Sequence, residues 1–227
     1  MSSQEKVRPW EELRNNVGAQ VVAWSAASLS HGGGADRSQA VATLAALRQA
    51  SPTDLGRSPE VWSAVVECVP VPLRGRGDEP SRAELAAFFA LSMYAVHQQS
   101  QRESVYKRGA SLGNALGQLA RSSAHGQAAM TRRFGALITS DGPEELFHHL
   151  RSLVSLMRTA RLSDGRPLGA RVDYGSLAVD LLQLLTPDYA PGARLRWGRD
   201  FTNYRPDQTP AVEDNPSITN EPKEGTP

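Results

Sequence analysis

The sequence contains a single cysteine, Cys68, and no long run of apolar residues. One thiol excludes an internal disulfide framework and a structural zinc site built from several thiolates. No apolar stretch approaches the roughly 18 residues that cross a bilayer, and the first ten residues carry neither the cationic nor the apolar region of a secretion signal. We therefore expect a cytoplasmic protein that does not enter a membrane and that is stabilised by packing alone.

Patterns typical of strands are also missing, since no segment alternates strongly between apolar and polar residues with a period of two. Apolar residues recur instead at three- and four-residue steps, as in Leu13, Val17 and Val21. Capping residues mark several helix starts, such as Ser81 with Glu84 three residues later. The spacing predicts helices at about 9–27, 36–51, 59–69, 82–97, 112–119, 130–138, 144–161, 174–185 and 193–204.

These helices predict an all-α fold with two helical bundles. We expect an N-terminal bundle over residues 1–100, whose apolar run at 85–96 forms a central buried helix, and a C-terminal bundle with a basic face over residues 101–205. The last helix is expected to bury Leu195. Residues 206–227 are acidic, contain five prolines and have almost no large apolar residues, so the sequence predicts a disordered tail there.

A catalytic or metal site is not evident in the sequence. His148 and His149 are adjacent, so on a helix they diverge by about 100° and cannot bind one metal ion together. His97 closes an apolar helix and is more typical of a polar residue at the rim of a core than of a general base. Cys68 lies among valines, with no adjacent cation to lower the pKa of its thiol. We therefore expect no enzymatic activity, no metal and no cofactor.

The charges are nearly balanced in number but unevenly distributed. The chain has 25 basic and 24 acidic residues, and all but three of the basic residues are arginine. Between Arg102 and Arg171, eleven basic residues stand against five acidic ones. A guanidinium group binds phosphate through two parallel hydrogen bonds, which an ammonium group does not do. This segment therefore favours a partner that carries phosphate groups.

The placement of the cations on predicted helices is more specific. Arg151 and Arg158 are seven residues apart and Arg161 follows three later, which predicts a row of guanidinium groups on the outer face of one helix. Arg132 and Arg133 precede the apolar Phe134, so at least one of them points outward.

Lys107 and Arg108 lie in the loop before the next predicted helix. If these elements pack side by side, their charges merge into one phosphate-binding patch. The alternative is that each cation is an ordinary solvated residue with a local acidic partner.

Six segments between Trp10 and Tyr204 also occur in a familiar order. They are residues 94–100, 111–116, 132–134, 150–153, 172–181 and 196–201. Together they resemble the small (CasB-type) subunit of the type I-E CRISPR surveillance complex, Cascade. The loop at 162–171, which is longer than usual, and the acidic tail depart from the pattern of this family.

The resemblance implies an all-helical protein of two bundles without enzymatic activity. It implies two stacked copies of the subunit along the guide RNA, between the large subunit and the repeated backbone subunit. The basic face of the family supports the duplex of guide RNA and target DNA and holds the displaced strand of the R-loop. By position, Arg132, Arg133 and Arg151 match the basic motif of the family, and Lys107, Arg108 and Arg48 match it more loosely. Arg158 and Arg161 extend the set from helix geometry alone.

Two other functions remain open at this point. In one, the protein is a purely architectural helical subunit whose cations bind acidic partner proteins. In the other it is a helix-turn-helix regulator, although no helix carries the row of Asn, Gln and Arg residues that base recognition requires. Retardation of single-stranded DNA by the isolated chain separates nucleic-acid binding from the architectural role.

Overall fold

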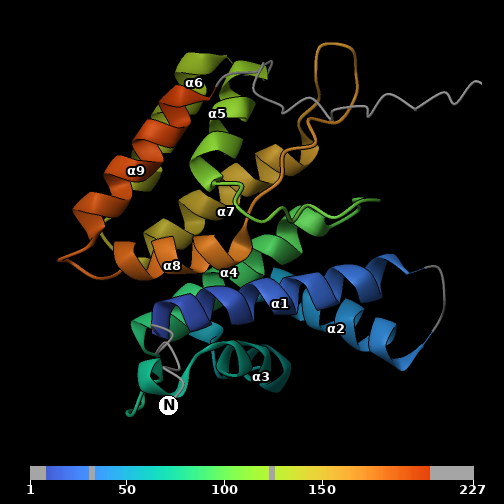
Figure 1. Ribbon diagram of the computed structural model, residues 1–227, viewed down its shortest axis with the longest axis vertical. Coiled ribbons are helices and arrows are strands. Elements are labelled where there is room, and N and C mark those ends of the chain that lie inside the picture. Colours follow the sequence, from blue (N-terminus) through green and yellow to red (C-terminus); the bar gives the residue numbers. More distant parts are fainter. Residues whose placement is uncertain (1–8, 31–33, 123–125, 205–227) are drawn as a thin grey trace, which may run out of the picture.

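The structure is a computed structural model that describes residues 9–30, 34–122 and 126–204, and nine α-helices make up most of this part of the chain (Figure 1). The helices are α1 (Pro9–Leu29), α2 (Ala35–Gln49), α3 (Pro59–Cys68), α4 (Arg82–Gln98), α5 (Leu112–Ser122), α6 (Gln127–Ile138), α7 (Pro143–Thr159), α8 (Tyr174–Leu184) and α9 (Ala190–Asn203). Two short 3-10 helices and two isolated β-bridges complete the regular structure of these residues. The predicted all-α fold is confirmed, and the predicted tail at 206–227 lies outside the described residues.

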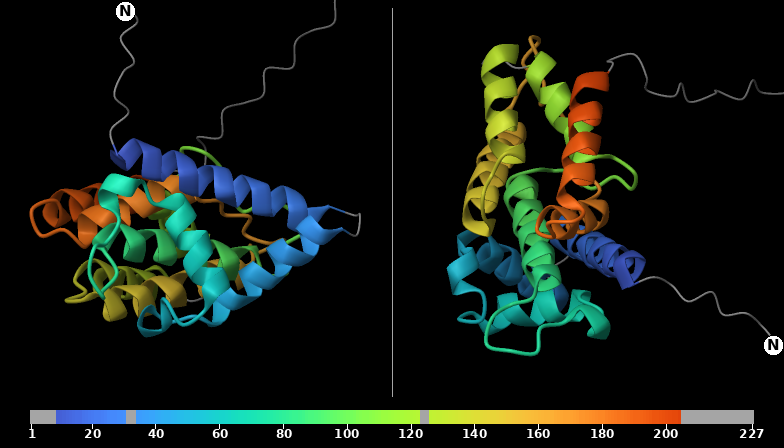
Figure 2. Two further views of the ribbon diagram at one scale, coloured as in Figure 1. Left: turned by 90° about the horizontal axis from the view of Figure 1, so that it is seen from below. Right: turned by 90° about the vertical axis from the view of Figure 1, so that its left-hand side faces the viewer.

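Helix α4 is the centre of the molecule. It begins with the predicted capping box, in which the Ser81 hydroxyl accepts a hydrogen bond from the main chain of Glu84 at 3.1 Å and the Glu84 carboxylate accepts one from the main chain of Ser81 at 2.6 Å. From Ala83 to Gln98 every residue except Leu85 is buried. The right-hand view of Figure 2 shows why, since α4 runs between the N-terminal helices and the C-terminal helices.

The C-terminal helices pack closely against one another. Gly113 and Gly117 of α5 face the main chain of α9, and a Cβ atom at either position would lie 2.8 Å or less from a main-chain oxygen of that helix. The rings of Phe134 and Phe201 stack at 4.3 Å between α6 and α9. One hydrophobic core runs from Leu13 to Phe201 and includes residues of both halves of the chain. The division into domains at residue 100 stays a prediction.

Three local expectations were wrong. In α9, which begins at Ala190 rather than at 193, Leu195 is 55% exposed because Trp197 and Phe201, one turn apart, form the buried face and Leu195 lies about 200° around the helix from Trp197. His97 is fully buried instead of lying at the rim of the core. Helix α7 ends at Thr159, because the chain then forms a bridge between Arg161 and Pro167. None of the described helices has the length and apolarity needed to cross a membrane.

Candidate nucleic-acid interface

Helices α2 and α7 bring three of the predicted cations together. Helix α7 buries an apolar stripe that includes Leu150 and Leu153, and Arg151 and Arg158 flank this stripe two turns apart. Arg48 lies in the last turn of α2, where a cation complements the partial negative charge of the helix end. All three side chains are half-buried, so the row predicted on α7 is less open to solvent than its spacing indicated. We call Arg48, Arg151 and Arg158 the arginine cluster.

Arg151 joins the two helices directly. Its guanidinium group donates a hydrogen bond through Nη2 to the main-chain oxygen of Arg48, one of the last carbonyl groups of α2. Its Nη1 atom is buried and has no hydrogen-bond partner among the described residues. Burial lowers the pKa of Arg151 below its ordinary value. Arg151 is therefore a partly desolvated cation with an unused donor.

Arg158 lies within electrostatic reach of Arg48. Its Nη1 atom donates a hydrogen bond to Oε1 of Gln99 at 2.9 Å, whereas its Nε atom is buried without a partner in the described chain. Burial lowers the pKa of Arg48, and the positive charge of Arg158 lowers it further. The same two causes lower the pKa of the His97 imidazole to about 4.

The described residues provide no carboxylate for this cluster. None of its three guanidinium groups forms an ion pair in that part of the chain. Several arginines elsewhere are neutralised, since Arg166 contacts Asp164 at 2.7 Å and Arg171 contacts Glu103 at 3.0 Å. Half-buried cations that lack a counter-ion repel one another, and an anion that binds to their exposed atoms relieves this repulsion.

Lys107 and Arg108 are exposed on a turn that the structure holds in place. The main-chain N–H of Ala110 donates to the carbonyl of Lys107 at 3.1 Å, and Gly109 has a φ of +79°, which glycine adopts without strain. The N–H of Gly109 donates to the buried carboxylate of Asp173 at 2.8 Å. The turn therefore presents two cations to solvent from a fixed main chain.

Arg132 and Arg133 are both exposed on α6, beside the buried Phe134. Within the described ranges neither of them forms an ion pair or a side-chain hydrogen bond. No interaction links them to the arginine cluster in this part of the chain. Seven of the predicted cations thus fall into three groups, with Arg161 apart from them, and the merging of all eight into one continuous surface stays a prediction.

Arg161 does not extend the row on α7, contrary to the expectation from helix geometry. The helix has ended two residues earlier, and the Arg161 side chain donates instead to the carbonyl oxygen of Gly165 at 3.1 Å. The main-chain N–H of Leu168 donates to the carbonyl of Ala160 at 2.9 Å and closes the same loop. Arg161 is exposed on this loop.

Comparison with known proteins identifies the family. Residues 43–201 match the model of a family described as CRISPR-associated protein Cse2. The chain belongs to the Cse2 family. The crystal structure of CasB from Thermobifida fusca is similar, with a TM-score of 0.62 and 28% sequence identity over 84% of this chain and 97% of that chain. No curated protein sequence matches the chain. These findings confirm the resemblance seen in the sequence to the CasB-type small subunit of Cascade.

The Cys68 thiol and the His149 imidazole, both considered above as catalytic or metal-binding groups, have structural surroundings in this Cse2 family member. Cys68 is buried, and burial, together with the negative charge of Glu67, raises the pKa of its thiol to about 12. His149 is paired with Glu145 one turn away, at 3.4 Å. In the described ranges, no three His, Cys, Asp or Glu side chains gather as metal ligands do.

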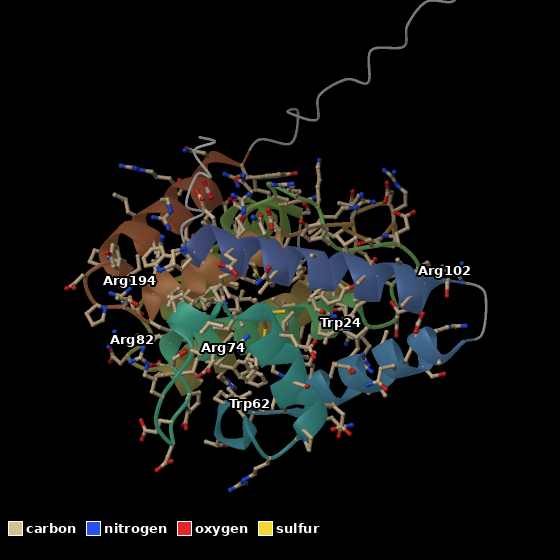
Figure 3. The ribbon with its side chains drawn as sticks, turned by 60° about the horizontal axis from the view of Figure 1, so that its bottom comes forward. Trp24, Trp62, Arg74, Arg82, Arg102 and Arg194 are labelled. Carbon is tan, nitrogen blue, oxygen red and sulfur yellow. The ribbon has the colours of Figure 1, made fainter. Side chains whose placement is uncertain are left out.

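Sequence reasoning missed two kinds of residue in the Cse2 fold. Gln99 and Gln101 contact Arg158 from the end of α4, and only the first was noted, as part of the segment 94–100. Arginines that cap helices were also missed. Arg74, labelled in Figure 3, donates to the carbonyl oxygens of Val69 and Val66 at 2.8 and 2.9 Å at the end of α3. No sequence signal distinguishes such a cap from a free cation, because the carbonyl it reaches is set by packing.

Proposed function

We propose that this Cascade subunit binds the phosphate groups of nucleic acid through Arg48, Arg151 and Arg158. By doing so it stabilises the R-loop of guide RNA and target DNA and holds the displaced strand during antiviral defence. The observation that supports this role is the proximity of Arg158 to Arg48, close enough to lower the pKa of Arg48, with no carboxylate paired to either side chain in the described chain.

The mechanism is electrostatic and does not depend on base sequence. Each cation that contacts a phosphate releases a condensed counterion, and this release drives binding. The sequence of the target is read by pairing with the guide RNA, so the protein needs only the backbone. Four other cations, Lys107, Arg108, Arg132 and Arg133, extend the contacts along the strand, together with Arg161 at the loop after α7.

The partners of this role are those that the family resemblance implies. They are the large subunit and the backbone subunit of Cascade, a second copy of this chain, the guide RNA, and the target and displaced DNA strands. The subunit acts in the cytoplasm and performs no chemical step of its own. Its contribution is to make the opened duplex lower in free energy than it is without the subunit.

Retardation of a single-stranded oligonucleotide in gels over a salt series tests this function. Each phosphate contact contributes about 0.7 to the slope of log affinity against log salt on a single strand. We expect the double variant Arg48→Ala/Arg158→Ala to flatten the slope by about 1.4. Arg132→Ala/Arg133→Ala is expected to flatten it by about 1 to 1.4.

A matched control is available in the same chain. Arg166→Ala/Arg171→Ala also removes two positive charges, but both of these arginines are paired with carboxylates, so the slope should not change. Unchanged slopes in both test variants would reject the proposed contacts. Absence of retardation by the wild-type protein, combined with binding to acidic partner proteins, would favour the architectural alternative.

A further inference from the structure

We propose that Gln99 is a positioning residue, which orients Arg158 toward a bound phosphate while leaving the positive charge of Arg158 intact. The inference deepens the function proposed above and rests on it. It assigns a role to the turn at the end of α4, where three glutamines lie within four residues of one another.

The turn itself is fixed by the first of these glutamines. Gln98 is buried, and its side-chain oxygen accepts a hydrogen bond from the main chain of Val105 at 3.1 Å. Its side-chain nitrogen donates to the carbonyl of Glu103 at 2.9 Å. Ser100 has a φ of +62°, a conformation that costs free energy in a residue other than glycine and that lasts only where its surroundings hold it.

The other two glutamines both contact Arg158. Oε1 of Gln99 accepts a hydrogen bond from Nη1 of Arg158 at 2.9 Å. Nε2 of Gln101 donates to the main-chain oxygen of Arg158 at 3.1 Å, and this carbonyl lies in the last turn of α7. The side chain and the main chain of Arg158 are thus held by the turn that follows α4.

The hydrogen bond between Gln99 and Arg158 matters because the guanidinium groups of Arg48 and Arg158 repel each other. A free Arg158 side chain would rotate away from Arg48 into solvent, and the two cations would no longer act on one anion. The Gln99 amide opposes this rotation with a directional hydrogen bond. Because the amide is neutral, the guanidinium keeps its full charge for a phosphate.

A carboxylate at position 99 would have the opposite effect. It would form a shorter, charge-assisted bond with Arg158 and would neutralise the cation before any phosphate arrived. The same chain shows this arrangement elsewhere, because Arg196 contacts Gln183 and, at 3.0 Å, the carboxylate of Asp180. Arg196 is positioned but neutralised, whereas Arg158 is positioned and keeps its charge.

The test uses the full chain and a single-stranded oligothymidylate in a salt series. Gln99→Glu should weaken binding about tenfold at low salt and lower the salt slope by about 0.7, the value of one phosphate contact. Gln99→Ala should leave the slope unchanged and weaken binding about threefold, because the Arg158 side chain must then be ordered on binding. Gln183→Glu, which adds the same charge beside an arginine that is already paired, should change neither quantity.

A second measurement shows whether the effect passes through Arg158. In the background of Arg158→Ala, Gln99→Glu should have no further effect on the slope. An equal loss in both backgrounds would mean that the added charge acts on the nucleic acid directly, and this would overturn the inference. Wild-type affinity and slope in Gln99→Glu would overturn it as well, as would wild-type affinity in Gln99→Ala.

The two proposals fail in different ways. If the wild-type chain does not bind the oligonucleotide, or if Arg158→Ala leaves the slope unchanged, the proposed function of the cluster is wrong. If Arg158→Ala lowers the slope and both Gln99 variants bind as the wild type does, only the role of Gln99 is wrong. Gln99 is exposed, so its variants should keep the thermal midpoint of the wild type.

Discussion

Nδ1 of His97 lies 2.7 Å from the hydroxyl oxygen of Tyr174, and this hydrogen bond joins α4 to α8 inside the core. Burial raises the pKa of Tyr174 well above its ordinary value, so its hydroxyl stays neutral. Burial and the nearby charge of Arg158 lower the pKa of His97 to about 4. The pair is therefore uncharged at neutral pH, within electrostatic reach of Arg158.

The depressed pKa of His97 predicts a pH dependence of stability. The folded protein holds His97 neutral down to about pH 4, whereas in the unfolded chain it takes up a proton near pH 6.5. The contribution of neutral His97 to the free energy of unfolding is therefore fully present above pH 6.5. It falls by about 3 kcal/mol as the pH decreases to 4. Urea unfolding at several pH values measures this loss. His97→Gln should remove most of it, and an unchanged profile in that variant would contradict the assignment.

Asp173 caps α8 and also anchors the turn that carries Lys107 and Arg108. Its carboxylate accepts hydrogen bonds from the main chain of Ser176 at 3.0 Å and of Gly109 at 2.8 Å. Asp173→Ala should lower the free energy of unfolding at pH 7 by about 2 kcal/mol, through the lost cap and the unpaired N–H of Gly109. Urea unfolding measures the difference.

The contribution of Asp173 should depend on pH. Burial alone would raise its pKa, but the bonds from Gly109 and Ser176 and the charge of Arg14 lower it below its ordinary value. A lowered pKa stabilises the folded state above about pH 3.9, and this stabilisation is lost as the pH falls further. The gap between wild type and Asp173→Ala should therefore narrow in acid. A difference in free energy of unfolding that stays constant with pH would show that the charge of Asp173 does not contribute to stability.

Comparing the stability of Arg151 and Arg132 variants should distinguish a cation that also supports the fold from one that does not. Arg151→Ala removes the hydrogen bond to the end of α2 and should lower the free energy of unfolding by about 1 kcal/mol. Arg132 is exposed and makes no such bond to the described residues, so Arg132→Ala should change stability by less than about 0.5 kcal/mol. Thermal unfolding of both variants checks this. Equal stability of the two would argue against a capping role for Arg151.

Gly175 sets the distance between α1 and α8. A Cβ atom at this position would lie 2.2 Å from the main-chain oxygen of Arg14, so Gly175→Ala must push the helices apart. We expect a loss of about 3 kcal/mol, measured by urea unfolding. Gly198→Ala is the matched control, because beyond its chain neighbours and its own helix backbone no described atom lies within 4 Å of the added Cβ, and it should raise stability by roughly 0.5 to 1 kcal/mol. Similar effects at both positions would exclude a steric cause.

Local signals in the sequence placed the capped starts of α4 and α8, whereas α6 and α9 each begin three residues earlier than predicted. Ser81 and Asp173 cap these two helices through hydrogen bonds that join residues only three apart, which is why such starts can be predicted from local sequence. Long-range features were not predictable in this way. Arg151 and Arg48 are separated by 103 residues, and their contact depends on how α7 packs against the end of α2. The family resemblance identified both residues as candidate binding residues, but their spacing in the sequence did not indicate that they are in contact.

The sequence by itself determined the helices of this protein, because caps, breakers and apolar spacing act within a few residues. It also determined the family, whose order of motifs can be recognised without coordinates. Only the tertiary structure decided which arginines remain free, because a guanidinium group loses solvent or gains a carboxylate through neighbours from distant helices. Arg158 and Arg171 look alike in the sequence, yet one is held by a neutral amide and the other is paired with Glu103.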